Sequence, residues 1–178
     1  MSVPRLFPLM TALLALAAPA LADSPTDAAK VFYGVYATFH PSDGIPGQAG
    51  LAKYVPYISP ALEKLLVEAE AAEARFAKAN KDSPPLIEGD LFSSMFEGAT
   101  STSIGTCKEQ AAKASCIVEQ TYNDGKDAPT HWSDTVYLAK TGSDWRVDDI
   151  VYGASWDFAN KGSLTATLHQ AIADAGAD

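Results

Sequence analysis

The apolar residues of this chain change their spacing once, and that change constrains the fold more than any other feature. Up to about residue 80, apolar side chains recur every three or four residues, as on one face of a helix. From residue 100 to 151, short runs rich in Thr, Ser, Val, Tyr and Trp are separated by turn residues. Helices followed by consecutive strands predict an α+β fold, in which helices cover one face of a curved antiparallel sheet of about four strands.

The expected elements follow from these patterns and from local start signals. We expect helices over residues 28–39, 51–58, 59–80 and 164–173, strands over 100–107, 115–122, 131–140 and 144–151, and an irregular linker with a short helical piece at 86–96. Ser59 is a good N-cap and Pro60 a good first helical residue, so the long helix has a well-marked beginning. Ser163 is expected to cap the C-terminal helix in the same way.

The last predicted strand has two chemically different faces. Alternation places Trp145 and Val147 in the core and Arg146 and Asp148 outside, where we expect these two to form an ion pair. Strict alternation would turn Asp149 inward, and an unpaired buried charge is costly. Either a bulge interrupts the strand at Asp148-Asp149, or Asp149 lines a polar cavity.

The first 22 residues have the layout of a secretory signal peptide. Arg5 precedes an apolar run over residues 6–21, and the run ends in the small-x-small sequence Ala-Leu-Ala at 20–22. Cleavage is therefore expected before Asp23, which would place the mature protein in the periplasm or outside the cell. A membrane anchor is the competing interpretation, but prolines leave the uninterrupted run well short of the ~20 apolar residues that a bilayer needs. We expect no membrane segment in the mature chain.

The remainder, residues 23–178, is long enough for one domain with a core of its own. The formal net charge is −9, and losing Arg5 with the leader would make it −10. Such a chain would repel phosphate backbones, so nucleic acid is excluded as a partner. The acidity mainly promotes solubility, and a cationic partner stays open.

Two cysteines, Cys107 and Cys116, remain in the predicted mature chain. An oxidising compartment favours a disulfide between them, closing a polar loop over residues 108–115 between two strands. A redox-active pair would be spaced as Cys-x-x-Cys, and a zinc site would need further Cys or His nearby. We therefore expect a structural disulfide, and neither a metal nor a cofactor.

Three stretches, taken together, resemble a known family. They are FY..Y at 32–36, YISPAL at 57–62 and WRVDDI at 145–150. They resemble the DUF3828 family of exported bacterial proteins, placed in the NTF2-like (cystatin-like) superfamily, over about residues 30–150. The resemblance implies an NTF2-like cone, a bent sheet wrapped about helices with one open end, and it matches Asp90 to an acidic residue just before the strands. Such cones include isomerases and dehydratases as well as non-catalytic binding modules, so fold does not decide function.

The candidate site residues are few, and none belongs to a known catalytic motif. Acid–base chemistry in a cone would use Asp90, Glu119, Asp149, His131 or His169, with Arg146 as a further candidate on a binding face. Glu119 shares a strand face with apolar residues and so could point inward, although an exposed carboxylate is the more frequent arrangement. The sequence contains no Gly-x-Ser-x-Gly, metal-binding pair or phosphate loop.

Two functions remain open. The first is a non-catalytic periplasmic binding or interaction module, in the manner of an immunity or inhibitor protein, acting as a monomer or homodimer on a protein or small-molecule partner. The second is a small-molecule acid–base enzyme with a carboxylate in the cone. A deep apolar cavity around a buried carboxylate would favour the enzyme, and a cone filled by side chains would favour the binding module.

Overall fold

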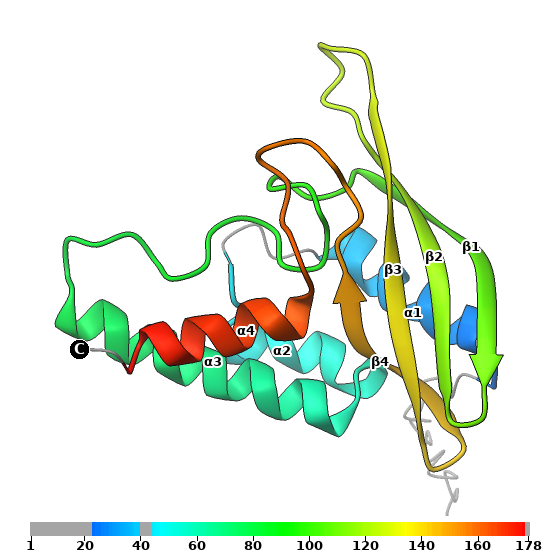
Figure 1. The fold of residues 1–178 in the computed structure, drawn as a ribbon, viewed down its shortest axis with the longest axis horizontal. Coiled ribbons are helices and arrows are strands. Elements are labelled where there is room, and N and C mark those ends of the chain that lie inside the picture. Colours follow the sequence, from blue (N-terminus) through cyan, green and yellow to red (C-terminus); the bar gives the residue numbers. More distant parts are fainter. Residues whose placement is uncertain (1–22, 40–43, 177–178) are drawn as a thin grey trace, which may run out of the picture.

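The computed structural model describes residues 23–39 and 44–176, and within them helices precede strands (Figure 1). The elements are α1 (Pro25–Thr38), α2 (Gln48–Tyr54), the 3₁₀ turn η1 (Val55–Tyr57), α3 (Pro60–Ala79), β1 (Ser101–Gln110), β2 (Lys113–Tyr122), β3 (Thr130–Thr141), β4 (Asp144–Val151) and α4 (Leu164–Asp174). The predicted signal peptide at 1–22 lies outside the described residues. The α+β prediction is confirmed, including the helix that follows the sheet.

The four strands form one antiparallel sheet in chain order, so each strand pairs with its neighbour in sequence. The connection between β1 and β2 is shorter than the predicted loop over 108–115. Strand pairing continues to Gln110 and Lys113, which leaves only Ala111 and Ala112 to turn, and Ala111 adopts the positive φ of 53° that tight hairpins need. Because β1 is largely exposed on both faces, it lacks the alternation by which strands are recognised in a sequence.

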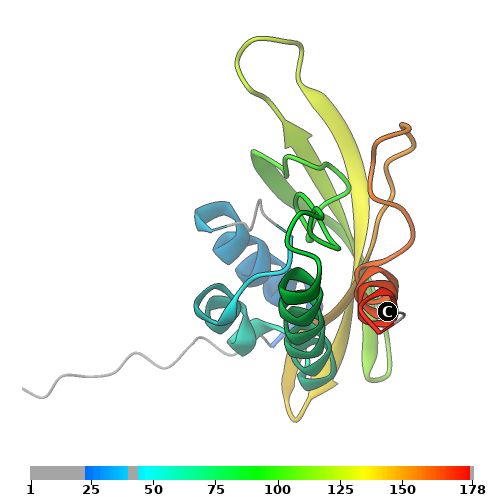
Figure 2. The ribbon, with the colours of Figure 1, turned by 90° about the vertical axis from the view of Figure 1, so that its left-hand side faces the viewer.

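Helix α1 lies across one face of the sheet, with α2 on the same side (Figure 2). It contacts all four strands. It begins at Pro25, three residues before the prediction, because Ser24 caps its first turn. Its buried face carries the aromatic side chains of Phe32, Tyr33 and Tyr36, so the core between α1 and the sheet is rich in aromatic rings and also contains two tyrosine hydroxyls.

Helices α3 and α4 pack against each other and lie side by side in Figure 1. Helix α3 begins where predicted, since the Ser59 hydroxyl accepts the Leu62 N–H at 3.0 Å and Pro60 occupies the first position. Its buried face consists of Leu62, Leu65, Leu66, Ala69 and Ala72. Ser163 caps α4 as expected. Among the described helices, none has the length and apolar composition that crossing a bilayer demands.

The predicted faces of β4 are confirmed, and so is one of the two explanations for its acidic pair. Trp145 is 3% exposed and Val147 fully buried. The pairing with β3 skips Asp148, which is therefore the extra residue of a β-bulge. The bulge shifts the alternation by one residue, so Ile150 returns to the core and Asp149 does not enter it as a bare charge.

The chain between α3 and β1, residues 80–100, is irregular throughout, without the short helical piece predicted near 86–96. Much of it is nevertheless buried, and the fully or almost fully enclosed residues are Asp90, Leu91, Phe92, Ser93 and Ser94. A buried loop needs partners for its backbone groups. The β4–α4 connection provides them: Asn160 Nδ2 donates to the carbonyls of Asp90 and Ser93, each at 2.8 Å, and the Tyr152 hydroxyl donates to the Leu91 carbonyl at 2.7 Å.

Candidate functional site: a buried carboxylate cluster

Asp90 is the predicted site residue that the fold buries most completely. It is 1% exposed and lies in the irregular segment before β1. Its Oδ1 accepts the Phe92 N–H at 2.7 Å, and its Oδ2 accepts the Tyr36 hydroxyl at 2.9 Å. Gly98 approaches the same oxygen so closely that a Cβ there would lie 2.6 Å from it, and its φ of +82° also requires glycine.

The pKa of Asp90 is raised from 3.8 to about 7, mainly because burial removes the hydration of the charged form, and to a smaller extent because of the nearby Asp134. The hydrogen bonds from Phe92 and Tyr36 act in the opposite direction, since they favour the carboxylate. The balance leaves a carboxyl group that exchanges its proton near neutral pH. This is the electrostatic property expected of a general acid or base.

Asp134 on β3 is a second buried carboxylate, and the sequence analysis missed it. It is 1% exposed. Its oxygens accept the Ser94 N–H at 2.9 Å, Gln120 Nε2 at 3.0 Å, Trp132 Nε1 at 3.2 Å and the Gly153 N–H at 2.8 Å, as well as the Ser94 hydroxyl. With five donors, Asp134 is a structural anchor that ties the two end loops to the sheet. A signal was present, because Asp134 interrupts the inward stripe formed by Trp132, Val136 and Leu138.

Three tyrosines from α1 and the β4–α4 connection accompany the two carboxylates. The Tyr36 hydroxyl also accepts the Ala99 N–H at 2.7 Å. Burial raises the pKa of Tyr33, Tyr36 and Tyr152, so all three hydroxyls remain protonated donors. The Tyr33 hydroxyl is buried and makes no hydrogen bond within the described residues.

Asp149 has a structural role at the beginning of α4. It is half-buried, and its Oδ1 accepts the N–H groups of Thr165 at 2.9 Å and of Ile150 at 2.8 Å. Its Oδ2 accepts the Thr165 hydroxyl at 2.9 Å. A carboxylate that lies against the first turn of a helix accepts hydrogen bonds from the free N–H groups there and interacts favourably with the helix dipole. Asp149 therefore lines no cavity and joins the β4 bulge to α4.

The predicted ion pair between Arg146 and Asp148 is wrong. Asp148 pairs instead with Lys113 of β2 at 2.8 Å, because the bulge displaces it from the register that simple alternation assumes. Arg146 is half-buried, and its Nε makes no hydrogen bond within the described residues.

The remaining candidates lie on the surface, away from the two buried carboxylates. Glu119 is exposed and accepts the Ser133 hydroxyl at 2.6 Å, so the inward alternative is wrong. His131 is exposed and its Nδ1 lies 2.9 Å from the Thr121 hydroxyl. His169 is exposed on α4.

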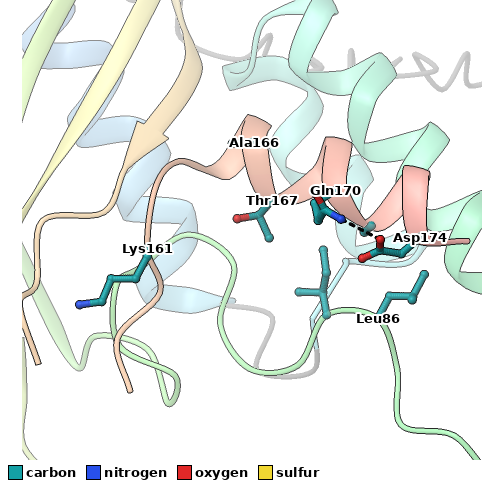
Figure 3. Close-up of a pocket in the computed structure, with 8 residues that line it drawn as sticks. Leu86, Lys161, Ala166, Thr167, Gln170 and Asp174 are labelled. Atoms are coloured by element: carbon teal, nitrogen blue, oxygen red, sulfur yellow. Dashed lines mark hydrogen bonds between the residues drawn. The ribbon is translucent and has the colours of Figure 1, made fainter. Parts of the chain in front are cut away.

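Two surface grooves flank α4, and neither is lined by Asp90 or Asp134. One, of about 420 Å³, lies between α3 and α4 and includes Asp148 and His169 in its lining. The other, of about 320 Å³, lies between α4 and the Leu86 segment, where Gln170 donates to Asp174 at 2.7 Å (Figure 3). In the described part of the chain, no group of three or more His, Cys, Asp or Glu side chains could hold a metal ion.

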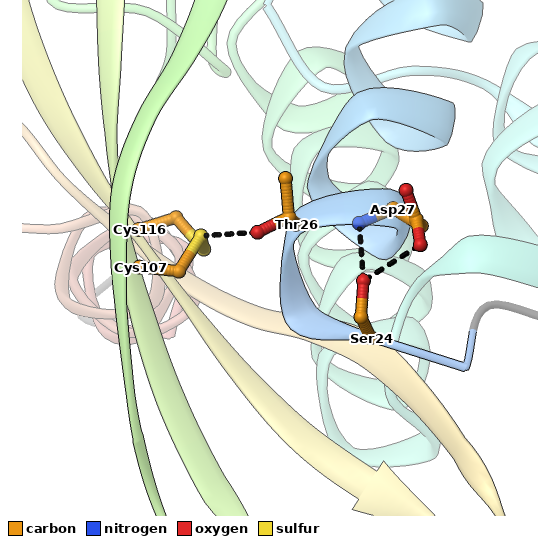
Figure 4. Close-up of a disulfide and its surroundings, with 5 residues drawn as sticks. All are labelled: Ser24, Thr26, Asp27, Cys107 and Cys116. Atoms are coloured by element: carbon orange, nitrogen blue, oxygen red, sulfur yellow. Dashed lines mark hydrogen bonds between the residues drawn. A yellow bond between two sulfur atoms is a disulfide. The ribbon is translucent and has the colours of Figure 1, made fainter.

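The predicted disulfide is present. Cys107 and Cys116 are directly paired across β1 and β2, with a Cα–Cα distance of 4.0 Å, just below the usual range of about 4.4–6.8 Å. The Thr26 hydroxyl at the beginning of α1 contacts the Cys107 sulfur at 3.2 Å (Figure 4). The bridge therefore lies beside the beginning of the helix that carries the aromatic core, and neither groove beside α4 includes the two cysteines in its lining, as expected of a structural disulfide.

Comparisons with known proteins give little further guidance. No protein-family model matches the chain, and no curated protein matches it. Among solved structures, it is similar to a SEC-C motif-containing protein from Rhodopseudomonas palustris, with 13% identity and a TM-score of 0.42 over 78% of this chain and 83% of that one. A likeness this weak supports no statement about function.

Proposed function

We propose that this chain is an exported, non-catalytic binding module that contacts a partner protein through the outer face of its sheet, the side opposite α1. The NTF2-like resemblance remains part of this proposal. The disulfide is consistent with an oxidising compartment, and the predicted leader supports export. Intact mass of the protein purified from the envelope tests export directly: the mature chain should begin at Asp23, and retention of Met1 would contradict it.

The observation that carries the proposal is the closure of the two buried carboxylates. A general acid or base must come within hydrogen-bond reach of its substrate. Asp90 and Asp134 are each 1% exposed, accept donors from the protein itself, and line neither of the grooves beside α4. Their arrangement explains how two long loops are held in place, and within the described residues neither groove beside α4 reaches them.

The outer face, in contrast, presents apolar side chains to solvent. Ile117 is 36% exposed, Tyr137 45% and Val151 37%. The register aligns Ile117 of β2 with Thr135 of β3 and Val151 of β4, and Tyr137 lies in the adjacent row. Among the described helices, α1 on the opposite face is the one that packs broadly on β2 and β3. Several exposed apolar side chains on one face of an open sheet are a feature of interaction surfaces.

Charge indicates the chemistry of the partner. The chain carries a net charge of −9, yet one end of the outer face carries Lys108, Arg146 and Lys113, the last of which is paired with Asp148. The register places Lys108 in the same row as Ser115 and Tyr137, and it places Lys113 and Arg146 in the next row. The expected partner is therefore a protein with an apolar contact surface bordered by acidic side chains.

A capture experiment with matched variants tests this surface. The mature protein is immobilised and exposed to periplasmic extract beside Tyr137→Asp and Val67→Asp. Val67 is the control because it is similarly exposed, at 47%, but lies on α3 and not on the sheet. A partner should bind the wild type and Val67→Asp and be lost from Tyr137→Asp, and its binding is then measured by titration with the purified pair. Equal binding to all three folded proteins would contradict the proposal, as would self-association through this face in sedimentation.

The acid–base enzyme is the second candidate, and one observation favours it. Burial raises the pKa of Asp90 to about 7 beside the Tyr36 hydroxyl, a pairing suited to moving a proton. This function would require the end loops to open. It predicts turnover of a small carbonyl or hydroxyl compound that is lost in Asp90→Asn and kept in Tyr137→Asp, the reverse of the pattern expected for partner binding.

A further inference from the structure

Tyr33 has a polar atom in the core for which the described residues supply no hydrogen-bond partner. The residue is 2% exposed on the inner face of α1, and its hydroxyl makes no hydrogen bond within the described residues. Phenylalanine would fill the same space without bringing a donor into the interior. A buried hydroxyl left unsatisfied loses its hydration and gains nothing in return. Native structures rarely keep such a group, and where they do an internal water is a frequent explanation.

The surroundings of this hydroxyl are polar. Asp134, Tyr36, Asp90 and Tyr152 all act on it electrostatically. The ring of Tyr33 stands edge-on to that of Tyr36, with centroids 5.8 Å apart. The neighbouring hydroxyls already donate elsewhere, Tyr36 to Asp90 at 2.9 Å and Tyr152 to the Leu91 carbonyl at 2.7 Å. Tyr33 is thus a donor among oxygens that can accept, and none of them lies within direct reach of it.

We propose that the Tyr33 hydroxyl forms one wall of an internal water site between α1 and the sheet, where a single water accepts a hydrogen bond from the hydroxyl and donates hydrogen bonds to the surrounding buried oxygens. A neutral molecule that both accepts and donates satisfies both sides of such a site. An anion is disfavoured by the two neighbouring carboxyl groups. The part of the chain that the structure describes offers no cluster of metal-ligating side chains. A water needs only two to four polar partners and about 10–15 Å³ of space.

The site would complete the buried polar cluster. It would connect Tyr33 on α1 with the carboxyl groups that hold the two end loops, so the helix and the loops would be joined through one hydrogen-bond network. This role is independent of the proposed partner binding, which uses the opposite face of the sheet.

Replacing Tyr33 by phenylalanine separates the alternatives by the sign of the effect. If the hydroxyl donates to a bound water, Tyr33→Phe removes a satisfied hydrogen bond and should raise the unfolding equilibrium constant roughly 5-fold in urea titrations. If the hydroxyl has no partner, the same change removes a buried unsatisfied donor, so the constant should stay unchanged or fall. Tyr137→Phe is the matched control, because that side chain is 45% exposed and its hydroxyl should be of little consequence.

A direct observation of the water completes the test. High-resolution crystal structures of the wild type and Tyr33→Phe should show one density peak within hydrogen-bond distance of Tyr33 Oη in the wild type and none there in the variant. Magnetic relaxation dispersion of water should count one fewer long-lived internal water in the variant. An empty site, a molecule larger than water, or a variant as stable as the wild type would each overturn the proposal.

Discussion

Asp90→Asn should change how the stability of this protein depends on pH. Asp90 is 1% exposed, and burial raises its pKa from 3.8 to about 7. Between pH 4 and 7 the unfolded chain has lost this proton while the folded chain still holds it. The unfolded state then binds fewer protons, so the free energy of unfolding falls as pH rises, by about 1.4 kcal/mol per pH unit. Over the whole interval the loss amounts to about 4 kcal/mol, and it levels off above pH 7 because both states are then ionised.

The asparagine variant removes this titration and keeps most of the geometry. Its side-chain carbonyl can still accept the Phe92 N–H, while its amide faces the Tyr36 hydroxyl, which already accepts the Ala99 N–H. A constant cost from that altered contact is expected at every pH. The informative quantity is therefore the difference between wild type and variant as a function of pH, in which such constant terms and most other titrating groups cancel.

Urea unfolding at fixed ionic strength between pH 4.5 and 8 measures this difference. The stability of Asp90→Asn relative to the wild type should rise steadily with pH up to about 7 and then stay level. Glu119→Gln is the control, because it removes one negative charge from an exposed position on the same sheet. A difference between Asp90→Asn and wild type that does not vary with pH would refute the reasoning, since it would mean that the folded protein does not hold the Asp90 proton.

Two further predictions concern the core and the staple. Trp145→Ala should lose about 3–5 kcal/mol of stability because the indole is 3% exposed. Arg146→Ala should lose no more than about 1 kcal/mol, because its half-buried side chain has no ion pair within the described residues. Thermal melting compares the two variants, and equal melting temperatures would contradict the assignment of the two faces. Reduction of the Cys107–Cys116 bond should lower stability by about 2.5–3 kcal/mol on the chain-entropy model. The stability of a Cys107→Ser, Cys116→Ser double variant should not respond to reductant. An unfolding midpoint of the wild type that is unchanged under reducing conditions would argue against a stabilising role.

Much of the architecture could be predicted because its signals are local. Ser59 and Pro60 mark the beginning of α3 within one turn, and Ser163 does so for α4. The inward positions of Trp145 and Val147 follow from alternation over three residues. The bulge was one of two alternatives that the sequence offered, the other being a polar cavity, because a second acidic residue directly after Asp148 cannot continue the pattern without burying a bare charge.

The errors have a common physical origin, which is that side-chain partners are chosen across the sheet. Arg146 and Asp148 are two residues apart in sequence, yet Asp148, at the bulge, pairs with Lys113 of β2, which is 35 residues away. Glu119 could have faced either way until its register with Ser133 decided the matter. No local pattern contains these pairings.

Asp90 shows most clearly where the sequence alone stops. Its residue type and its place before the strands could nominate it, but its partner Tyr36 lies 54 residues away, and the neighbouring Asp134 is held by Ser94, 40 residues distant. The order of helices and strands, the helix caps and the cysteine pair are encoded by neighbouring residues, so the sequence by itself determined them. The burial of the carboxylates, the raised pKa of Asp90 and the exposure of apolar side chains on the outer face were decided only by tertiary structure. Desolvation and exposure depend on which distant segments exclude water from a group, and that is settled when the whole chain folds.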